Sequence, residues 1–199
     1  MSDEPSPEWA LAQVDAHRAA ADAFAELALA DVLSVAAVLR GSFEGGGFLY
    51  TFGNGGSAAD AQHFTGELIG HYKRDRRALP AVTLTTDATV ISCVANDYSY
   101  DEVFSRQVEA LARPGDVIAA FSTSGRSPNV IAGLRAAKAK GATTVLFGGA
   151  TGGPAAAYAD HQLLAPARET ARIQEVHTLM LHLISEFLDA WAAGEDPSA

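Results

Sequence analysis

The segment Phe48–Ser57 reads Phe-Leu-Tyr-Thr-Phe-Gly-Asn-Gly-Gly-Ser and gives the first indication of the architecture. Residues 48–52 form a short apolar run that predicts a buried strand. The glycines after it predict a tight turn, and a helical pattern begins at Ser57, a suitable N-cap, and continues to about Ile69. We therefore expect a strand that runs through a glycine-rich turn into a helix.

The same alternation continues along the rest of the chain. Further short apolar runs predict strands at Ala81–Leu84, Asp116–Phe121, Thr143–Phe147 and Gln162–Leu164. Helical patterns surround them, at Pro7–Phe43, Asp101–Ala112, Pro128–Lys140 and Thr170–Ala193. Short buried strands that alternate with helices are typical of a parallel sheet with helices on both faces. We therefore expect one α/β domain, made of an N-terminal helical segment (1–45), an α/β core (46–193) and a flexible tail (194–199).

Composition excludes several classes of protein. The 199 residues carry 14 Lys and Arg against 24 Asp and Glu, a net charge of −10, which argues against binding to duplex nucleic acid. The single Cys93 excludes an intrachain disulfide and suits a reducing compartment. The first residues lack a secretory signal pattern, and no apolar run approaches the roughly 18 residues of a membrane helix. We expect a cytoplasmic protein that contacts no membrane.

Two segments are suited to bind a phosphate group. The turn Gly53–Ser57 lets the backbone approach a ligand, and the helix after it offers free N–H groups and the positive end of its dipole. The segment Phe121–Pro128 also lies between a strand and a helix, and Arg126 adds a positive charge there. Its hydroxyl side chains belong to Ser122, Thr123, Ser124 and Ser127.

Either segment alone is also consistent with an ordinary strand-to-helix turn, in which Gly, Ser and Thr serve as caps. Neither contains the Gly-Lys-Ser/Thr of a Walker A loop or the G-x-G-x-x-G of a dinucleotide site, so we expect no nucleotide cofactor. At the carboxyl ends of strands in one sheet, the two segments together favour a sugar-phosphate site.

Three motifs carry a resemblance to a known family: Gly-Asn-Gly-Gly-Ser-Ala-Ala-Asp-Ala-Gln-His-Phe at 53–64, Ser-Thr-Ser-Gly at 122–125 and Arg-Ile-Gln-Glu-Val-His at 172–177. The chain resembles the sugar isomerase (SIS) family along nearly its whole length. Within that family it is similar to the phosphoheptose isomerases, which convert sedoheptulose 7-phosphate to D-glycero-D-manno-heptose 7-phosphate. The Ser-Thr-Ser-Gly motif indicates only the broad family. The pairs His63…Glu67 and Gln174…His182 are more specific.

The resemblance implies a single SIS domain with a five-stranded parallel sheet, a homotetramer packed through its N-terminal helices, and active sites between subunits. It implies one zinc ion per subunit, held by residues that match His63, Glu67, Gln174 and His182. Glu67 and His182 would form the acid–base pair. The implied substrate-binding residues are Asn54, Gly55, Gly56, Glu67, Asn96, Asp97, Ser122, Thr123, Ser124, Ser127 and Gln174.

The residue chemistry agrees with this activity. Aldose–ketose isomerisation moves a proton between C1 and C2 through an enediolate, which needs a base and stabilised charge on the oxygens. His63 and Glu67 lie four residues apart on a predicted helix and share a face, as metal ligands can; alternatively they are an ordinary partly buried histidine and a solvated glutamate. Gln174 and His182 lie eight apart, roughly 12 Å along a helix, which indicates an irregular helix or ligands from different subunits.

Other residues have simpler interpretations. We expect His177 and Cys93 to pack in the core. The basic run Lys73–Arg77 is either a surface for an anionic substrate or a solvated loop, and the solvated loop is the default expectation. Arg126 stands where members of the family often carry Asn, so it is a position that can shift substrate choice.

Two other functions are compatible with this fold. A non-catalytic relative would bind another protein, such as a replication initiator, but it would have no need of the complete set His63, Glu67, Gln174 and His182. An isomerase of a different sugar phosphate, such as arabinose 5-phosphate or a hexulose 6-phosphate, would have the same fold. The complete set favours an enzyme, with a heptose phosphate as the first candidate substrate.

Overall fold

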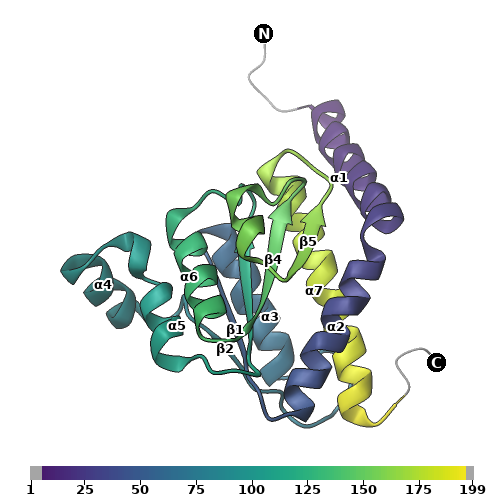
Figure 1. Cartoon of the computed structure of the whole chain (residues 1–199). Coiled ribbons are helices and arrows are strands. Elements are labelled where there is room, and N and C mark those ends of the chain that lie inside the picture. The colour runs from purple at the N-terminus through teal and green to yellow at the C-terminus, as the bar shows by residue number, and fades with distance from the viewer. Residues whose placement is uncertain (1–5, 196–199) are drawn as a thin grey trace.

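The computed structural model describes residues 6–195, so the last part of the expected tail, 196–199, lies outside the described residues. Its centre is a five-stranded sheet in the order β2-β1-β3-β4-β5, with every neighbouring pair parallel (Figure 1). This confirms the predicted α/β class and its five-stranded parallel sheet. The strands are β1 (Leu49–Gly53), β2 (Ala81–Thr83), β3 (Val117–Ser122), β4 (Thr143–Gly149) and β5 (His161–Ala165).

Helices cover both faces of the sheet. They are α1 (Pro7–Leu27), α2 (Leu29–Glu44), α3 (Gly56–Ile69), α4 (Ala88–Asp97), α5 (Ser105–Leu111), α6 (Pro128–Ala139) and α7 (Thr170–Ala193), with short 3-10 helices at Tyr100–Glu102 and Gly153–Tyr158. Val117, Ala119 and Phe121 belong to the apolar core that α2, α3 and α7 share with the sheet, whereas Ile118 and Ala120 belong to the core shared with α5 and α6. Successive side chains of a strand point to opposite faces, so β3, which is apolar from residue 117 to residue 121, is buried on both sides.

The structure corrects three details of the predicted elements. The N-terminal helical pattern is divided at Ala28 into α1 and α2. Gly55, with φ +57°, occupies the N-cap position of α3, and Ser57 is a buried residue inside the helix, so its prediction as the N-cap was wrong. Helix α4 was not predicted, because its β-branched residues weaken the helical pattern. None of the helices in the described part of the chain is long and apolar enough to cross a membrane.

Candidate active site

Two parallel helices, α3 and α7, form the framework of the site. Near their starts, Gly56 faces Gln174 so closely that a Cβ at Gly56 would lie 2.2 Å from the amide nitrogen of Gln174. Farther along, the Nε2 atoms of His63 and His182 lie 3.3 Å apart. Gly56 and Gln174 therefore precede the two histidines by a similar number of residues, which shows that the helices run side by side in the same direction.

The side chains of His63, Glu67 and His182 form a compact cluster between these helices. Their ligand atoms all lie within 4.8 Å of one another, and Nε2 of His63 lies 3.0 Å from Oε1 of Glu67. Burial, followed by the neighbouring His63, lowers the pKa of His182, although Glu67 acts in the opposite direction. Two imidazoles and a carboxylate are a donor set that suits Zn²⁺, so these residues fit a metal ion.

Gln174 lies nearer the start of α7 than His182 does. It lies on the continuous helix α7, eight residues before His182, which corresponds to roughly 12 Å along the axis. Its side chain instead faces Gly56 at the start of α3. The helix is regular here, so of the two possibilities raised by the spacing, an irregular helix is excluded by the structure.

The glycine-rich turn and the hydroxyl-rich loop lie next to each other because β1 and β3 are paired, with Gly53 opposite Phe121. The amide groups of Asn54 and Asn129 exchange two hydrogen bonds of 2.9 Å, and the hydroxyl of Tyr100 donates to Oδ1 of Asn54 at 3.2 Å. These bonds connect the start of α3 with the start of α6. Asn129 and Tyr100 were not predicted as part of the site. For Asn129, its position directly after the helix-initiating Pro128 was the feature of the sequence that could have indicated it.

Inside the loop, Ser122 and Gly125 are structural while Ser124 is exposed. The hydroxyl of Ser122 accepts a hydrogen bond from the N–H of Gly125 at 3.1 Å, and Ser122 is only 5% exposed. Gly125 has φ +59° and packs against Gly152. A Cβ atom at position 125 would lie only 1.8 Å from the carbonyl oxygen of Gly152. The Ser124 hydroxyl accepts from the N–H of Arg126 at 3.2 Å and remains accessible to a ligand. Thr123 and Ser127 are half-buried.

Asn96 and Asp97 lie at the end of α4 and are exposed. Nδ2 of Asn96 donates to Oδ1 of Asp97 at 2.7 Å, and the thiol of Cys93 lies 3.5 Å from Oδ2 of Asp97. Cys93 is exposed, so the expectation that it packs in the core was wrong for this chain. His177, by contrast, is fully buried, as predicted.

Asp60 is a further polar residue of α3 that sequence reasoning missed. It is 9% exposed, it lies between Gly56 and His63 along the helix, and its Oδ2 has no hydrogen-bond partner among the described residues. Burial raises its pKa to about 6. Asp60 lies three residues before His63, so it is on the same side of α3 as the cluster. This spacing could have indicated from the sequence that Asp60 lies near the cluster.

The basic run Lys73–Arg77 is not simply a solvated loop. The side chains of Arg76 and Asp189 are both fully buried, and Nε of Arg76 lies 2.9 Å from Oδ1 of Asp189. Lys73 and Arg74 pair with Glu186 of α7. The default expectation was therefore wrong for Arg76, whose buried partner lies far away in the sequence.

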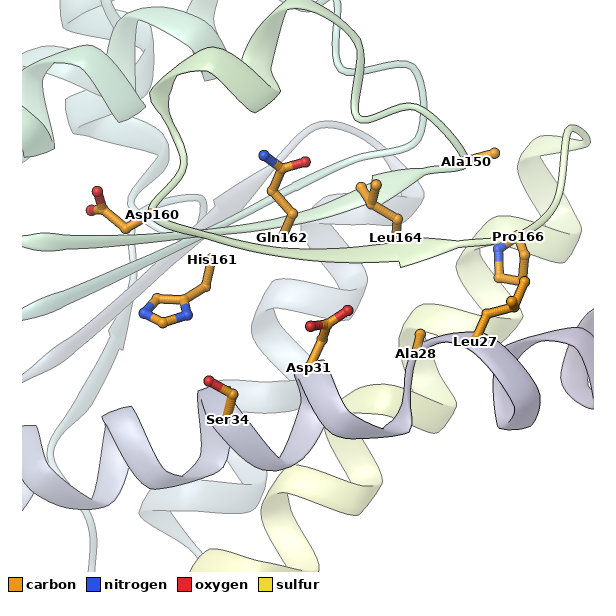
Figure 2. Close-up of a pocket in the computed structure, with 10 residues that line it drawn as sticks. All are labelled: Leu27, Ala28, Asp31, Ser34, Ala150, Asp160, His161, Gln162, Leu164 and Pro166. Carbon is orange, nitrogen blue, oxygen red and sulfur yellow. The ribbon is translucent and has the colours of Figure 1, made fainter.

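A cavity of about 660 Å³ lies elsewhere, between β5 and the junction of α1 and α2 (Figure 2). The side chain of His161 points from β5 toward α2, where Asp31 and Ser34 lie. The residues that line this cavity include none of the predicted site residues. It is therefore separate from the candidate active site.

Comparisons with known proteins identify the family of the chain. Residues 14–149 match the family model of the SIS domain. A phosphoheptose isomerase of Aquifex aeolicus is 46% identical over 167 residues, which cover 84% of this chain and 87% of the relative. The solved phosphoheptose isomerase of Neisseria gonorrhoeae superposes with a TM-score of 0.88 at 37% identity, covering 92% of this chain and 98% of the other. That of Francisella tularensis gives 0.90 at 29% identity, covering 94% and 99%.

The chain therefore belongs to the SIS domain family. Within this family it is similar to the phosphoheptose isomerases over most of its length, and it is an isomerase.

Proposed function

We propose that this isomerase interconverts sedoheptulose 7-phosphate and D-glycero-D-manno-heptose 7-phosphate through an enediolate. The observation that supports this most strongly is the cluster of His63, Glu67 and His182 on the pair of helices α3 and α7. Helix α3 starts beside a loop of accessible hydroxyl and amide groups that suits a phosphate. The names of the similar enzymes add the seven-carbon sugar phosphate as substrate class.

The phosphate would bind at the loop of Ser122, Thr123, Ser124 and Ser127, at the start of α6. This helix end carries partial positive charge and backbone donors, so it can hold a phosphate although the protein is acidic. Asn54, Gly55 and Gly56 would contact the sugar from the neighbouring turn, and Asn96 and Asp97 would approach from α4. The phosphate would thereby hold the C1–C2 end of the sugar toward α3 and α7.

Glu67 and His182 would carry out the proton transfers. One group moves the proton between C1 and C2, and the other moves the proton of the adjacent oxygens. Burial is the main cause of the lowered pKa of His182, and it favours the neutral form of the imidazole. Their closeness to each other fits a reaction at two adjacent carbon atoms.

A zinc ion bound by His63, Glu67 and His182 would polarise the carbonyl and hydroxyl oxygens of the substrate. Gln174 would complete the ligand set from a neighbouring subunit, because its distance from His182 along α7 is too large within one chain. This supports a homotetramer with active sites between subunits. The single cysteine suits a cytoplasmic enzyme.

The rival functions differ in what the site must do. A protein-binding relative would have no need of the acid–base cluster. An isomerase of another sugar phosphate is the alternative that Arg126 leaves open, because this residue stands where members of the family often carry Asn. The test is NMR of the purified protein with sedoheptulose 7-phosphate in D₂O, with added zinc and with a chelator. We expect an aldoheptose 7-phosphate with deuterium at C2 and loss of turnover on chelation. No turnover under any metal condition would favour a protein-binding role or another sugar phosphate.

A further inference from the structure

The buried carboxylate of Asp189 organises the loop that follows α3. Its oxygens accept hydrogen bonds from the backbone N–H groups of Tyr72, Lys73 and Arg74 at 3.2, 2.9 and 2.7 Å. The Nε of Arg76 donates to the same carboxylate at 2.9 Å. Burial alone would raise the pKa of Asp189, but these donors hold that pKa below its usual range, so the group is charged at neutral pH.

The other end of the Arg76 guanidinium binds the last turn of α3. Its Nη2 donates to the carbonyl oxygen of Glu67 at 2.7 Å, and its Nη1 donates to those of Leu68 and Gly70 at 2.8 and 3.2 Å. Carbonyl groups at a helix end lack partners within the helix and carry partial negative charge, so a buried arginine suits them. Arg76 and Asp189 therefore connect the end of α3 directly to α7.

This connection places an aromatic ring on the histidine of the acid–base cluster. Asp189 follows His182 by seven residues, or about two helical turns, so both lie on the same face of α7. The loop held by Asp189 carries Tyr72, whose ring stacks on that of His182 with centroids 5.4 Å apart and planes 26° apart. The ring of His63 meets that of His182 edge to face, with centroids 4.9 Å apart and planes 81° apart. His182 thus contacts two rings, one of them from the loop that Asp189 holds.

We propose that Arg76, Asp189 and Tyr72 are positioning residues for the acid–base and metal cluster. The buried ion pair fixes the helix end that carries Glu67 and holds Tyr72 against His182. The imidazole and the carboxylate are then already oriented for a metal ion and for proton transfer, instead of being ordered by the ligand. This inference rests on the proposed function, because it assigns these residues to the same cluster.

The test is titration of the apoprotein with Co²⁺, whose visible spectrum reports both affinity and ligand geometry and needs no sugar turnover. Tyr72→Ala removes the ring at a half-buried loop position, whereas Tyr72→Phe retains it. We expect Tyr72→Ala to bind Co²⁺ about 10- to 100-fold more weakly, as is usual when a group that orients a ligand is lost. Tyr72→Phe should retain the wild-type affinity and spectrum.

Arg76→Lys keeps a positive charge near Asp189 but loses the fork that reaches Glu67 and Leu68. It should weaken Co²⁺ binding, change the spectrum and lower kcat more than it raises KM. Leu188→Ala is the matched control, because Leu188 is fully buried on the adjacent position of α7 and its truncation destabilises the same helix without touching the loop contacts of Asp189. It should melt at a lower temperature with unchanged Co²⁺ affinity.

Each outcome has a defined meaning. Wild-type Co²⁺ affinity and spectrum in Tyr72→Ala would overturn the inference and leave the proposed function intact, whether or not Arg76→Lys folds. An equal loss of affinity in Leu188→Ala would also overturn it, because the effect would then follow from lost stability. Absence of Co²⁺ binding by the wild-type protein would remove the metal site from the proposed function, and the positioning role would fall with it.

Discussion

Glu67 is the side chain on which the proposed proton transfers depend most directly. Glu67→Gln keeps the size and hydrogen-bonding capacity of the side chain but removes its ability to accept a proton. We expect turnover to fall by about 10²- to 10⁴-fold, the usual contribution of a positioned acid or base. The NMR assay measures the rate, and circular dichroism and sedimentation show that the fold and assembly persist. A variant with wild-type turnover would exclude Glu67 from the proton transfers.

Ser124 tests the phosphate loop. Its hydroxyl is exposed, whereas that of Ser122 is already used inside the loop, so Ser124 is the better position for a ligand contact. A hydrogen bond to a charged group contributes about 1.5–3 kcal/mol, so Ser124→Ala should raise KM by roughly tenfold or more with a smaller effect on kcat. Ser34→Ala, at an exposed position of α2, is the matched control. If both variants show the wild-type KM, the phosphate does not contact Ser124.

At the scale of single residues, the sequence was most informative where spacing within one helix determines proximity. His63 and Glu67, four residues apart, lie within 3.0 Å of each other. Asn129, Asp60 and Arg76 were missed or misinterpreted because their roles depend on burial and on partners from other elements. The sequence around a polar residue does not reveal whether its side chain is surrounded by water or by protein.

At the scale of elements, His177 links α7 to the end of β4. Its Nε2 lies 3.0 Å from the carbonyl oxygen of Gly148, and its ring meets the rings of Phe121 and Phe147. Burial lowers its pKa from 6.5 to about 4. Below pH 6.5 the unfolded chain therefore binds a proton at His177, whereas the folded chain does not bind it until about pH 4. The free energy of unfolding falls across this pH window, by about 3 kcal/mol for this residue.

His177→Gln retains a donor for Gly148 but does not titrate. We expect the variant to lose less unfolding free energy than the wild type between pH 7 and pH 4.5, as measured by urea unfolding at both pH values. Asp60, whose pKa is raised to about 6, acts in the opposite direction in both proteins and cancels in the comparison. Equal acid losses in the two proteins would show that His177 is protonated in the folded state.

The order of elements was predictable, but their contacts were only partly so. The apolar runs located every strand to within a few residues, most clearly β1, β3 and β4, which are buried on both faces or nearly so. The break at Ala28 leaves the helical pattern almost continuous and was not visible. The parallel packing of α3 on α7, on which the site depends, joins segments more than a hundred residues apart, and no local pattern reports it.

At the scale of the whole molecule, the N-terminal helices expose large apolar side chains. Trp9 of α1 and Leu33 of α2 are each 61% exposed, and Leu11 is 55% exposed. Isolated apolar residues are common on surfaces, but a series along adjoining helices favours contact with another chain. We expect the wild-type protein to sediment as a tetramer and the double variant Trp9→Lys/Leu33→Lys to sediment as smaller species with reduced turnover. A fully tetrameric double variant would place the subunit contacts elsewhere.

The common direction of α3, α6 and α7 has a consequence for how fast substrate is captured. The first two start directly after the carboxyl ends of β1 and β3, so their positive ends, each equivalent to about half an elementary charge, meet at one edge of the sheet. The chain as a whole carries −10 and repels a phosphate dianion at long range. Raising the ionic strength from about 10 to about 100 mM shortens the Debye length from about 30 to about 10 Å, which screens the repulsion before it screens the contacts within the site. The second-order capture rate, read as kcat/KM, should therefore increase with moderate salt, the reverse of the behaviour of an enzyme that attracts its anion by net charge.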